Sequence, residues 1–122
     1  MANKATQIIY PRLTVYSDEN FRGLSRTYRG NLGIRNTNFI LGGVESLRFF
    51  SINRDATLVL FSRTRFRGNF RVYRGITNLR DLDDLINGND VQSIISTNQL
   101  LTIAEIRRIQ LTGILPRGYR RI

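Results

Sequence analysis

The chain has 122 residues, neither cysteine nor histidine, and a formal net charge of +10. These absences exclude disulfides, thiolate nucleophiles, imidazole bases and the common zinc ligands, and leave oxygen ligands for a hard cation such as Ca²⁺. We therefore expect a single domain that is not an enzyme, large enough to bury roughly two-thirds of the surface that its unfolded chain exposes.

Residues 1–11 are expected to form a short N-terminal arm. The stretch MANKATQIIYP lacks the long apolar core and the small-residue cleavage site of a secretory signal. No apolar run in the chain approaches the about 20 residues that span a bilayer. These features predict an intracellular protein without a membrane span, and the segment TQIIYP could dock on a neighbouring copy.

Residues 12–97 are expected to form two units of short strands, over 12–52 and 57–97. The stretches RLTVYS, ATLVLFS and NFRVYRG are rich in β-branched and aromatic residues, and GVESLRFFSI and DVQSIIS end the two units in the same way. The turn-rich connections GNLGIRNTNFILGG and GITNLRDLDDLINGND have the length that a Greek key requires. Four strands in each unit predict an all-β sandwich of two sheets.

The two units repeat one another. Residues 13–30, moved by 45 positions, match residues 58–75 at nine of eighteen positions without a gap. Further along, GGVESLRFFS and NDVQSIISTN align at an offset of 47, so the second connection is longer by two residues. Agreement of this kind within one chain indicates an internal duplication.

Each unit carries an aromatic residue, then four residues, then Phe-Arg-Gly. The glycine permits a positive φ or lets a ring lie on bare backbone, and the two aromatic rings could stack across a folded hairpin. A serine at the start of the last strand could hydrogen-bond the backbone of that hairpin. These structural residues are Tyr16, Phe21, Gly23 and Ser46 in the first unit, and Phe61, Phe66, Gly68 and Ser93 in the second.

Eighteen of the nineteen basic residues are arginine, and only Lys4 is lysine. Arginine suits ordered protein contacts as well as phosphate or carboxylate pairing, so self-association, a polyanion partner and a bias of the source proteome remain open. Strand alternation places two matched arginine–tyrosine pairs opposite Phe70 and Val72, on a face expected to be exposed and to serve an interface or a polyanion. The pairs are Arg26 with Tyr28 and Arg71 with Tyr73.

Residues 98–122 form a C-terminal extension beyond the duplicated units. Thr102 and Glu105 could form a capping box, with Ile103, Ile106 and Ile109 on one helical face. Alternatively, RIQLTG alternates like a strand. The extension could close the core of its own domain or dock on a neighbour. PRGYRRI at its end is basic with one aromatic residue and could meet phosphate or carboxylate, but a frayed terminus is the favoured expectation.

The tandem stretches YSDENFRG and FSRTRFRG, each followed by a serine-containing loop and strand, resemble the βγ-crystallin superfamily over residues 12–97. The resemblance implies a double Greek-key domain, structural or calcium-binding. In calcium-binding members the loop reads Asn/Asp-Asn/Asp-x-x-Ser/Thr-Ser, and two sites form between the motifs. Here NDVQSI (89–94) keeps most of that pattern, whereas GGVESL (42–47) has glycines in place of the oxygen ligands.

The resemblance thus implies at most one calcium site. The implied ligands are Asp90, Ser93 and Asn89 from one loop, the carbonyl of Val44 from the other, and Asp18 from the acidic first hairpin. A second site would place Gly43 beside Arg63 and Arg65, which repel a divalent cation. The alternative is that Asp90 only forms a turn and Ser93 only fixes its hairpin.

Three functions follow as hypotheses. The first is a structural or self-associating crystallin-type protein with one possible calcium ion, assembling through its arms and the arginine–tyrosine face. The second is an arginine-rich module that binds nucleic acid or another polyanion, although its arginines are spread along the chain and no nucleic-acid motif is visible. The third is a small toxin or inhibitor, against which the missing cysteines argue.

Overall fold

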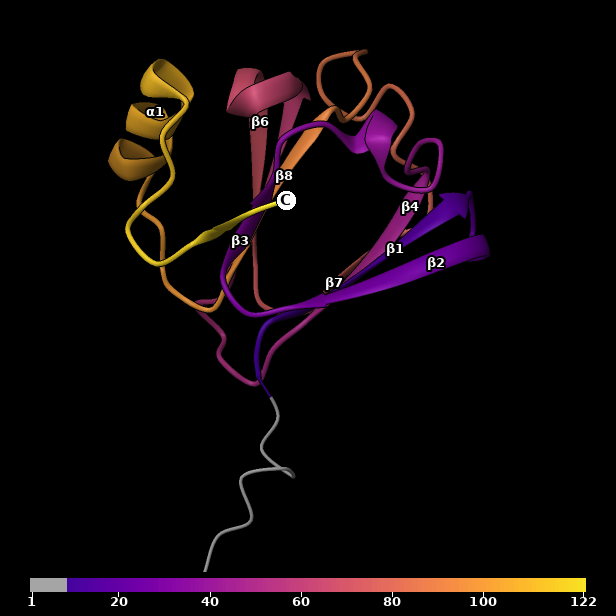
Figure 1. The fold of residues 1–122 in the computed structure, drawn as a ribbon, viewed down its shortest axis with the longest axis horizontal. Coiled ribbons are helices and arrows are strands. Elements are labelled where there is room, and N and C mark those ends of the chain that lie inside the picture. The colour runs from indigo at the N-terminus through magenta and orange to yellow at the C-terminus, as the bar shows by residue number, and fades with distance from the viewer. Residues whose placement is uncertain (1–8) are drawn as a thin grey trace, which may run out of the picture.

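The structure, a computed structural model, describes residues 9–122 and consists of two packed β-sheets with one α-helix on the outside (Figure 1). The N-terminal arm lies outside the described residues except for residues 9–11. The first unit contributes β1 (Arg12–Asp18), β2 (Arg22–Arg29), β3 (Leu32–Ile34) and β4 (Ser46–Phe50). The second contributes β5 (Thr57–Arg63), β6 (Arg67–Arg74), β7 (Thr77–Leu79) and β8 (Ser93–Thr97), and a ninth strand, β9, spans Arg120–Arg121.

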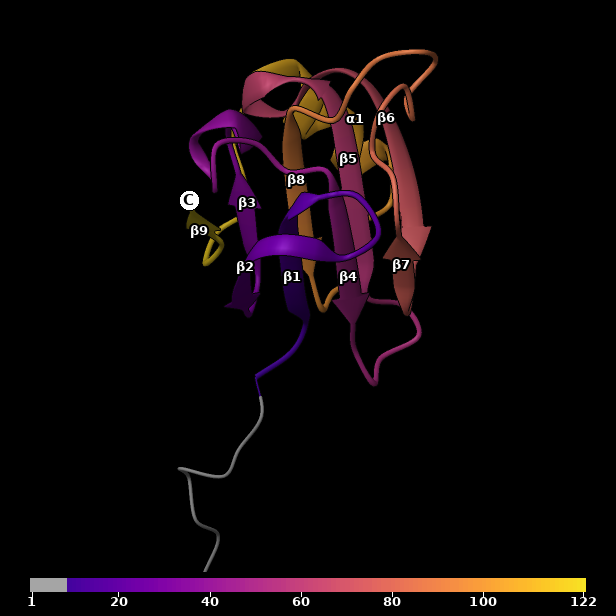
Figure 2. The same cartoon turned by 90° about the vertical axis from the view of Figure 1, so that its right-hand side faces the viewer.

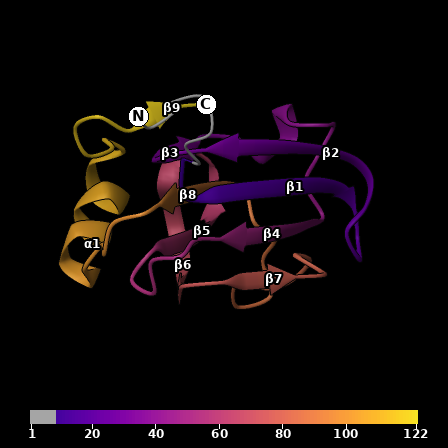
Figure 3. The ribbon, with the colours of Figure 1, turned by 90° about the horizontal axis from the view of Figure 1, so that it is seen from below.

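The third strand of each unit crosses into the sheet of the other. The first sheet has the order β2-β1-β4-β7 and the second the order β6-β5-β8-β3-β9. Figure 2 shows the strands of the first sheet in front of those of the second, and Figure 3 shows the two layers and the helix from below. The predicted all-β sandwich of two Greek keys is therefore confirmed, with β3 and β7 lying in the connections that were expected to return over the sheets.

The space between the sheets holds the main hydrophobic core. Alternate side chains of β1 and β4 point inward and meet those of β5, β3 and β8. The largest of these buried side chains are Leu13, Leu32, Ile34, Leu47, Phe49, Leu58, Leu60 and Ile94. Each contributes about 1.5–3 kcal/mol by leaving water, so this layer supplies most of the stability.

The two hairpins of the repeat have matching geometries. The rings of Tyr16 and Phe21 meet edge to face with centroids 5.7 Å apart, and those of Phe61 and Phe66 do so at 5.8 Å. Gly23 and Gly68 have φ values of +79° and +80°, and a Cβ on either would collide with the serine hydroxyl of its own hairpin, Ser17 or Ser62. Glycine is therefore required at both positions by conformation and by space.

The serines that enter β4 and β8 fix these hairpins. The Ser46 hydroxyl accepts a hydrogen bond from the Phe21 N–H at 3.0 Å and donates one to the Asp18 carbonyl at 2.6 Å. The Ser93 hydroxyl makes the same pair of bonds, with the Phe66 N–H at 3.0 Å and the Arg63 carbonyl at 2.6 Å. Both hydroxyls thus close their own hairpin against the adjacent strand.

The C-terminal extension covers the outer face of the second sheet. Its helix α1 (Ile103–Thr112) begins with the capping box of Thr102 and Glu105, so the helical alternative is the correct one and the strand alternative is wrong. Ile106 and Ile109 are buried against the sheet, whereas Ile103 is exposed. A second apolar cluster results, formed by Val59, Phe61, Phe66, Ile95, Leu101, Ile106 and Ile109. The extension closes its own domain on this face.

The expectation of a frayed terminus is wrong. β9 pairs in parallel with β3 at the edge of the second sheet, and the Tyr119 hydroxyl is hydrogen-bonded to Thr97 at 2.6 Å and to Gln99 at 2.7 Å. The Ile122 N–H donates to the Gly33 carbonyl at 2.8 Å. The last residues are held because β3 offers an unpaired edge that these backbone groups satisfy.

The expectation that the arginine–tyrosine face is exposed is also wrong for the tyrosines. Tyr28 and Tyr73 are half-buried and pack against the main core, while Arg26 and Arg71 are exposed. Phe70 and Val72 point the opposite way, into the cluster beneath α1. The side chains of β6 alternate as predicted, but both faces of the strand are covered. Phe70 and Val72 face α1, and the opposite face, which carries Tyr73, packs against the main core.

Candidate functional site

Acidic side chains converge at the end of the sandwich where β1 passes into β2. The backbone brings them there, because β7 pairs with β4 of the first unit and the residues after β7 then follow the edge of the first sheet. The Leu82 N–H donates to the Glu45 carbonyl at 3.0 Å, and the Asn20 N–H donates to the Arg80 carbonyl at 2.8 Å. These bonds hold the segment 80–83 between the first hairpin and the loop before β4.

Three carboxylates meet at this point. Oxygen atoms of Glu19, Asp81 and Asp83 all lie within 4.8 Å of one another, and all three residues are exposed. Asp83 also lines a cavity of about 350 Å³ together with Glu45 and Asp90, which we call the acidic cavity. Five of the nine acidic residues of a chain with net charge +10 therefore share one small region.

Two of these carboxyls have raised pKa values, to which the other negative charges close to them contribute. The pKa of Glu45 lies above its usual value because burial disfavours the charged form, and because Asp83 and Asp90 add negative charge beside it. The pKa of Glu19 is raised chiefly by the charge of Asp81, with smaller effects of burial and of Asp83. Both shifts mean that this end of the folded molecule resists carrying its full negative charge.

Only part of the implied ligand set comes together. Asp90 and Val44 line the acidic cavity, and one Asp90 carboxylate oxygen accepts the Asp84 N–H at 2.9 Å. Asn89 pairs through its backbone with Ile86 in a tight bridge. Asn89, Asp18 and Ser93 are not among the residues that line the cavity.

Two of those implied ligands have other bonds. The Asp18 carbonyl accepts the Ser46 hydroxyl at 2.6 Å, and the Ser93 hydroxyl is bonded to the second hairpin. Asp90 thus lines the acidic cavity, while the Ser93 hydroxyl, three positions further along the chain, is bonded to the second hairpin.

Glu45, Asp81 and Asp83 were not among the ligands expected from the sequence. The stretch RDLDDL (80–85) lies in the turn-rich connection GITNLRDLDDLINGND, and it carries acidic residues that complete this region. The signal was the acidic run itself, placed in the connection that must cross between the sheets. Gly42 and Gly43 line the same acidic cavity, so the loop without side-chain ligands still bounds it with backbone.

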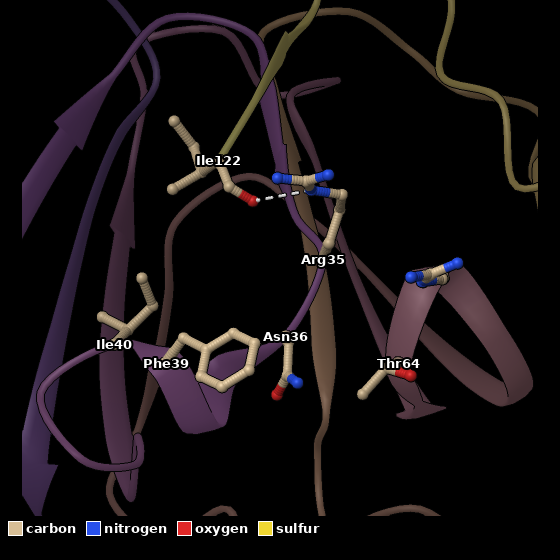
Figure 4. A pocket seen from close by; sticks show the side chains of 7 residues that line it. Arg35, Asn36, Phe39, Ile40, Thr64 and Ile122 are labelled. Carbon is tan, nitrogen blue, oxygen red and sulfur yellow. Dashed lines mark hydrogen bonds between the residues drawn. The ribbon is translucent and has the colours of Figure 1, made fainter.

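A basic cavity lies on the other side of a short 3₁₀ turn, η2 (Thr37–Phe39). Thr37 and Asn38 line the acidic cavity, whereas Phe39 lines a second cavity of about 520 Å³ together with Arg35 and Arg65 (Figure 4). Arg63 and Arg65 belong to the second hairpin, in the places that Asp18 and Asn20 hold in the first. Of these four residues only Arg65 lines either cavity, so the charge difference between the hairpins reaches the basic cavity through Arg65.

Two interleaved Greek keys with exchanged third strands, paired aromatic hairpins and a serine at each hairpin define a βγ-crystallin-type domain. No family model matches the sequence, and no curated protein matches it. Solved structures do match it. The NMR structure of spherulin 3A from Physarum polycephalum aligns with 70% of this chain and 82% of its own, at 27% identity and a TM-score of 0.53.

Two further structures give the same result. One, solved in work on the evolution of the eye-lens βγ-crystallin domain fold, covers 70% of this chain and 84% of its own at 24% identity, with a TM-score of 0.53. A βγ-crystallin from Ciona intestinalis covers 70% and 99%, at 16% identity and a TM-score of 0.50. The chain therefore has the βγ-crystallin fold. Among residues 9–122, no helix has the length and apolarity that a membrane span requires.

Proposed function

We propose that the chain is a non-enzymatic structural protein of the crystallin type that binds one calcium ion at its acidic end. The observation that carries the proposal is the convergence of Glu19, Glu45, Asp81, Asp83 and Asp90 in a chain of net charge +10. Carboxylates this close repel one another, and the raised pKa values of Glu45 and Glu19 reflect that repulsion. A divalent cation would remove it.

The donor set fits calcium and not a transition metal. The region offers carboxylate oxygens and backbone carbonyls, which are the ligands that Ca²⁺ takes, and the chain has no thiol or imidazole. Asp90 and Val44 are retained from the implied set, and Glu45 and Asp83 are added to it. Ser93 is left out, because its hydroxyl already donates to Arg63 and accepts from Phe66.

One ion is proposed and not two. A second ion would have to bind toward the second hairpin, where Arg63 and Arg65 replace the residues of the acidic hairpin. Positive charge at that position opposes a cation at short range. The duplication thus has one acidic half and one basic half.

Calorimetric titration with CaCl₂ tests this proposal. We expect one equivalent of calcium to bind, and we expect Asp90→Asn to weaken binding at least about tenfold, since it removes a charge but keeps the oxygen that accepts the Asp84 N–H. Asp55→Asn is the matched control, because Asp55 is an exposed carboxylate outside the acidic region. The proposal is wrong if millimolar calcium gives no heat, or if both variants bind as the wild type does.

Self-association is the second proposed property. It is supported by two exposed isoleucines, Ile52 (76% exposed) and Ile76 (60% exposed), which line one cavity together with Phe50. Phe50 pairs with Arg12, at the end of β1 away from the first hairpin. Exposed apolar side chains that adjoin one another are typical of interaction surfaces. The other suggested contacts, the N-terminal arm and Arg26 and Arg71 on the edge strands, would add to this surface.

We expect the weight-average mass in sedimentation to rise with protein concentration, and Ile52→Ser to reduce that rise. Leu111→Ser is the control, because Leu111 is equally exposed, at 77%, but lies on α1. A constant monomer mass, or equal behaviour of the two variants, would contradict self-association through this surface.

A further inference from the structure

The basic cavity beside η2 has a composition unlike that of the acidic one. It holds two arginines, two neutral polar side chains and three apolar ones, and none of the residues from 9 onward that line it is acidic. Its volume, about 520 Å³, is within the range of small-molecule sites. Its lining residues are Arg35, Asn36, Phe39, Ile40, Thr64, Arg65 and Ile122.

The backbone holds the two arginines next to each other. The Arg65 N–H donates to the Arg35 carbonyl at 2.8 Å, which joins the second hairpin to the segment after β3. The Arg35 Nε–H donates to the Ile122 carbonyl at 3.3 Å, so this guanidinium is oriented by the chain after β9 (Figure 4). Two guanidinium groups that line one cavity, with no acidic side chain beside them in the described part of the chain, provide a site for an anion with several oxygens.

Neutral donors add to this site. The Asn36 Oδ1 accepts the Asn38 N–H at 2.9 Å, which fixes the side-chain amide and leaves its NH₂ group as a donor. Thr64 lines the cavity on the opposite side from Phe39. Arginine and amide donors around one space match the oxygen atoms of a phosphate group.

An aromatic ring stands at the same cavity. Phe39 is 83% exposed, and its ring lies beside the space that Arg35 and Ile122 border (Figure 4). No aromatic contact covers this ring among the described residues. A planar ring next to guanidinium groups is the combination on which nucleic-acid bases stack.

The positive surface continues past the cavity. A neighbouring hollow of about 250 Å³ shares Arg35 and Arg65 with it and adds Arg67 and Arg121. The four guanidinium groups thus follow the second hairpin and the C-terminal strand, as a chain of phosphates would require.

We propose that this cavity binds a nucleotide, with the phosphate on Arg35 and Arg65 and the base stacked on Phe39. A free nucleotide and single-stranded nucleic acid share this chemistry, and the adjoining Arg67 and Arg121 favour the strand. The site is separate from the acidic cavity, since η2 lies between them, and it requires no metal.

The duplication provides a test variant that preserves the fold. Arg65 has a φ of +59°, and its counterpart in the first hairpin, Asn20, has the same value. Asparagine tolerates this left-handed conformation better than most residues, so Arg65→Asn removes the guanidinium without straining the hairpin. Arg22→Gln is the control for net charge, because Arg22 is exposed on β2 in the other sheet. Phe39→Ala tests stacking.

Binding is measured by anisotropy of a fluorescein-labelled oligothymidylate of about eight nucleotides at low salt, and by calorimetry with AMP and with inorganic phosphate. We expect Arg65→Asn and Phe39→Ala each to weaken oligonucleotide binding about tenfold, and Arg22→Gln to change it less than twofold. With two phosphates neutralised, the logarithm of the binding constant should fall with the logarithm of salt concentration with a slope of about −1.4.

The outcomes separate the alternatives. Binding of AMP as tight as that of the oligonucleotide assigns the site to free nucleotides, and much tighter binding of the oligonucleotide assigns it to single strands; either result supports the proposal. The proposal is overturned if neither probe binds at low salt, or if Arg65→Asn and Arg22→Gln weaken binding equally. It is also overturned if inorganic phosphate competes as well as AMP and Phe39→Ala has no effect.

Discussion

Replacement of Phe66 by alanine is expected to lower the free energy of unfolding by about 4 kcal/mol, near the upper end of large-to-small substitutions in a core. Phe66 is 1% exposed and lies in the cluster between the second sheet and α1. Its ring rests on the bare backbone of Gly33, where a Cβ would collide with it. Since Gly33 belongs to β3 and Phe66 to the second hairpin, the cavity left by alanine cannot close by moving one loop.

The duplication supplies the control. Phe21 occupies the equivalent position in the first hairpin but is only half-buried, because no helix covers it, and the Arg48 guanidinium lies over its ring at 3.7 Å from the centroid. We expect Phe21→Ala to cost about 1–2 kcal/mol, since less apolar surface is lost. Urea unfolding followed by circular dichroism measures both. Equal losses in the two variants would show that α1 does not stabilise the second hairpin in solution.

The hairpins were predictable from the sequence because their determinants are local. The spacing of Tyr16, Phe21 and Gly23 recurs with Phe61, Phe66 and Gly68, and each set lies within eight residues. A positive φ and an edge-to-face ring contact depend on neighbours in the chain, so the pattern specifies them directly. The residue that receives the Phe66 ring was not predictable, because Gly33 comes from the other unit.

The exposed face assigned to Tyr28 and Tyr73 was wrong for a related reason. Alternation tells which residues share a side of a strand, but not which side meets the core. On β6 both sides are apolar, because Phe70 and Val72 pack toward α1 while Tyr73 packs toward the first sheet. Which apolar side of β6 faces the main core depends on α1, which begins about 30 residues after β6 ends.

The acidic region, too, could be predicted only in part from the sequence. Asp90 and Val44 could be placed together from the resemblance of their loops, but Asp83 and Glu45 could not. Their proximity depends on β7 leaving its own unit to pair with β4, and this exchange of strands has no marker in the local sequence. The resemblance of the loops therefore located one side of the candidate calcium site and missed the other.

The acidic region should make the calcium-free protein more stable on mild acidification from pH 7. The pKa values of Glu45 and Glu19 are raised in the folded state, so the folded chain keeps protons at pH values where the unfolded chain has released them. Stability from these groups is present below the ordinary glutamate pKa of about 4.3 and is lost as pH rises through the raised values. Glu105 acts oppositely, because its pKa is lowered by hydrogen bonds from Thr102, so its contribution is lost as pH falls through that lowered pKa.

Asp83→Asn links this pH dependence to calcium, because it should change stability in opposite directions with and without the ion. In EDTA at pH 7 the variant should melt about 2–4 °C higher than the wild type, since Asp83 is a cause of the raised pKa of both Glu45 and Glu19. In calcium at 100 times the dissociation constant, the wild type should gain about 2.7 kcal/mol and the variant much less, which reverses their order.

Thermal unfolding by circular dichroism between pH 5 and 8, with EDTA or CaCl₂, measures this crossing, and Asp55→Asn should follow the wild type throughout. If Asp83→Asn lowers the melting temperature in EDTA, the carboxylates stabilise the fold by contacts of their own. Relief of carboxylate repulsion by a bound cation would then be ruled out as the source of calcium binding. If the order in calcium does not reverse, the ion does not bind at Asp83.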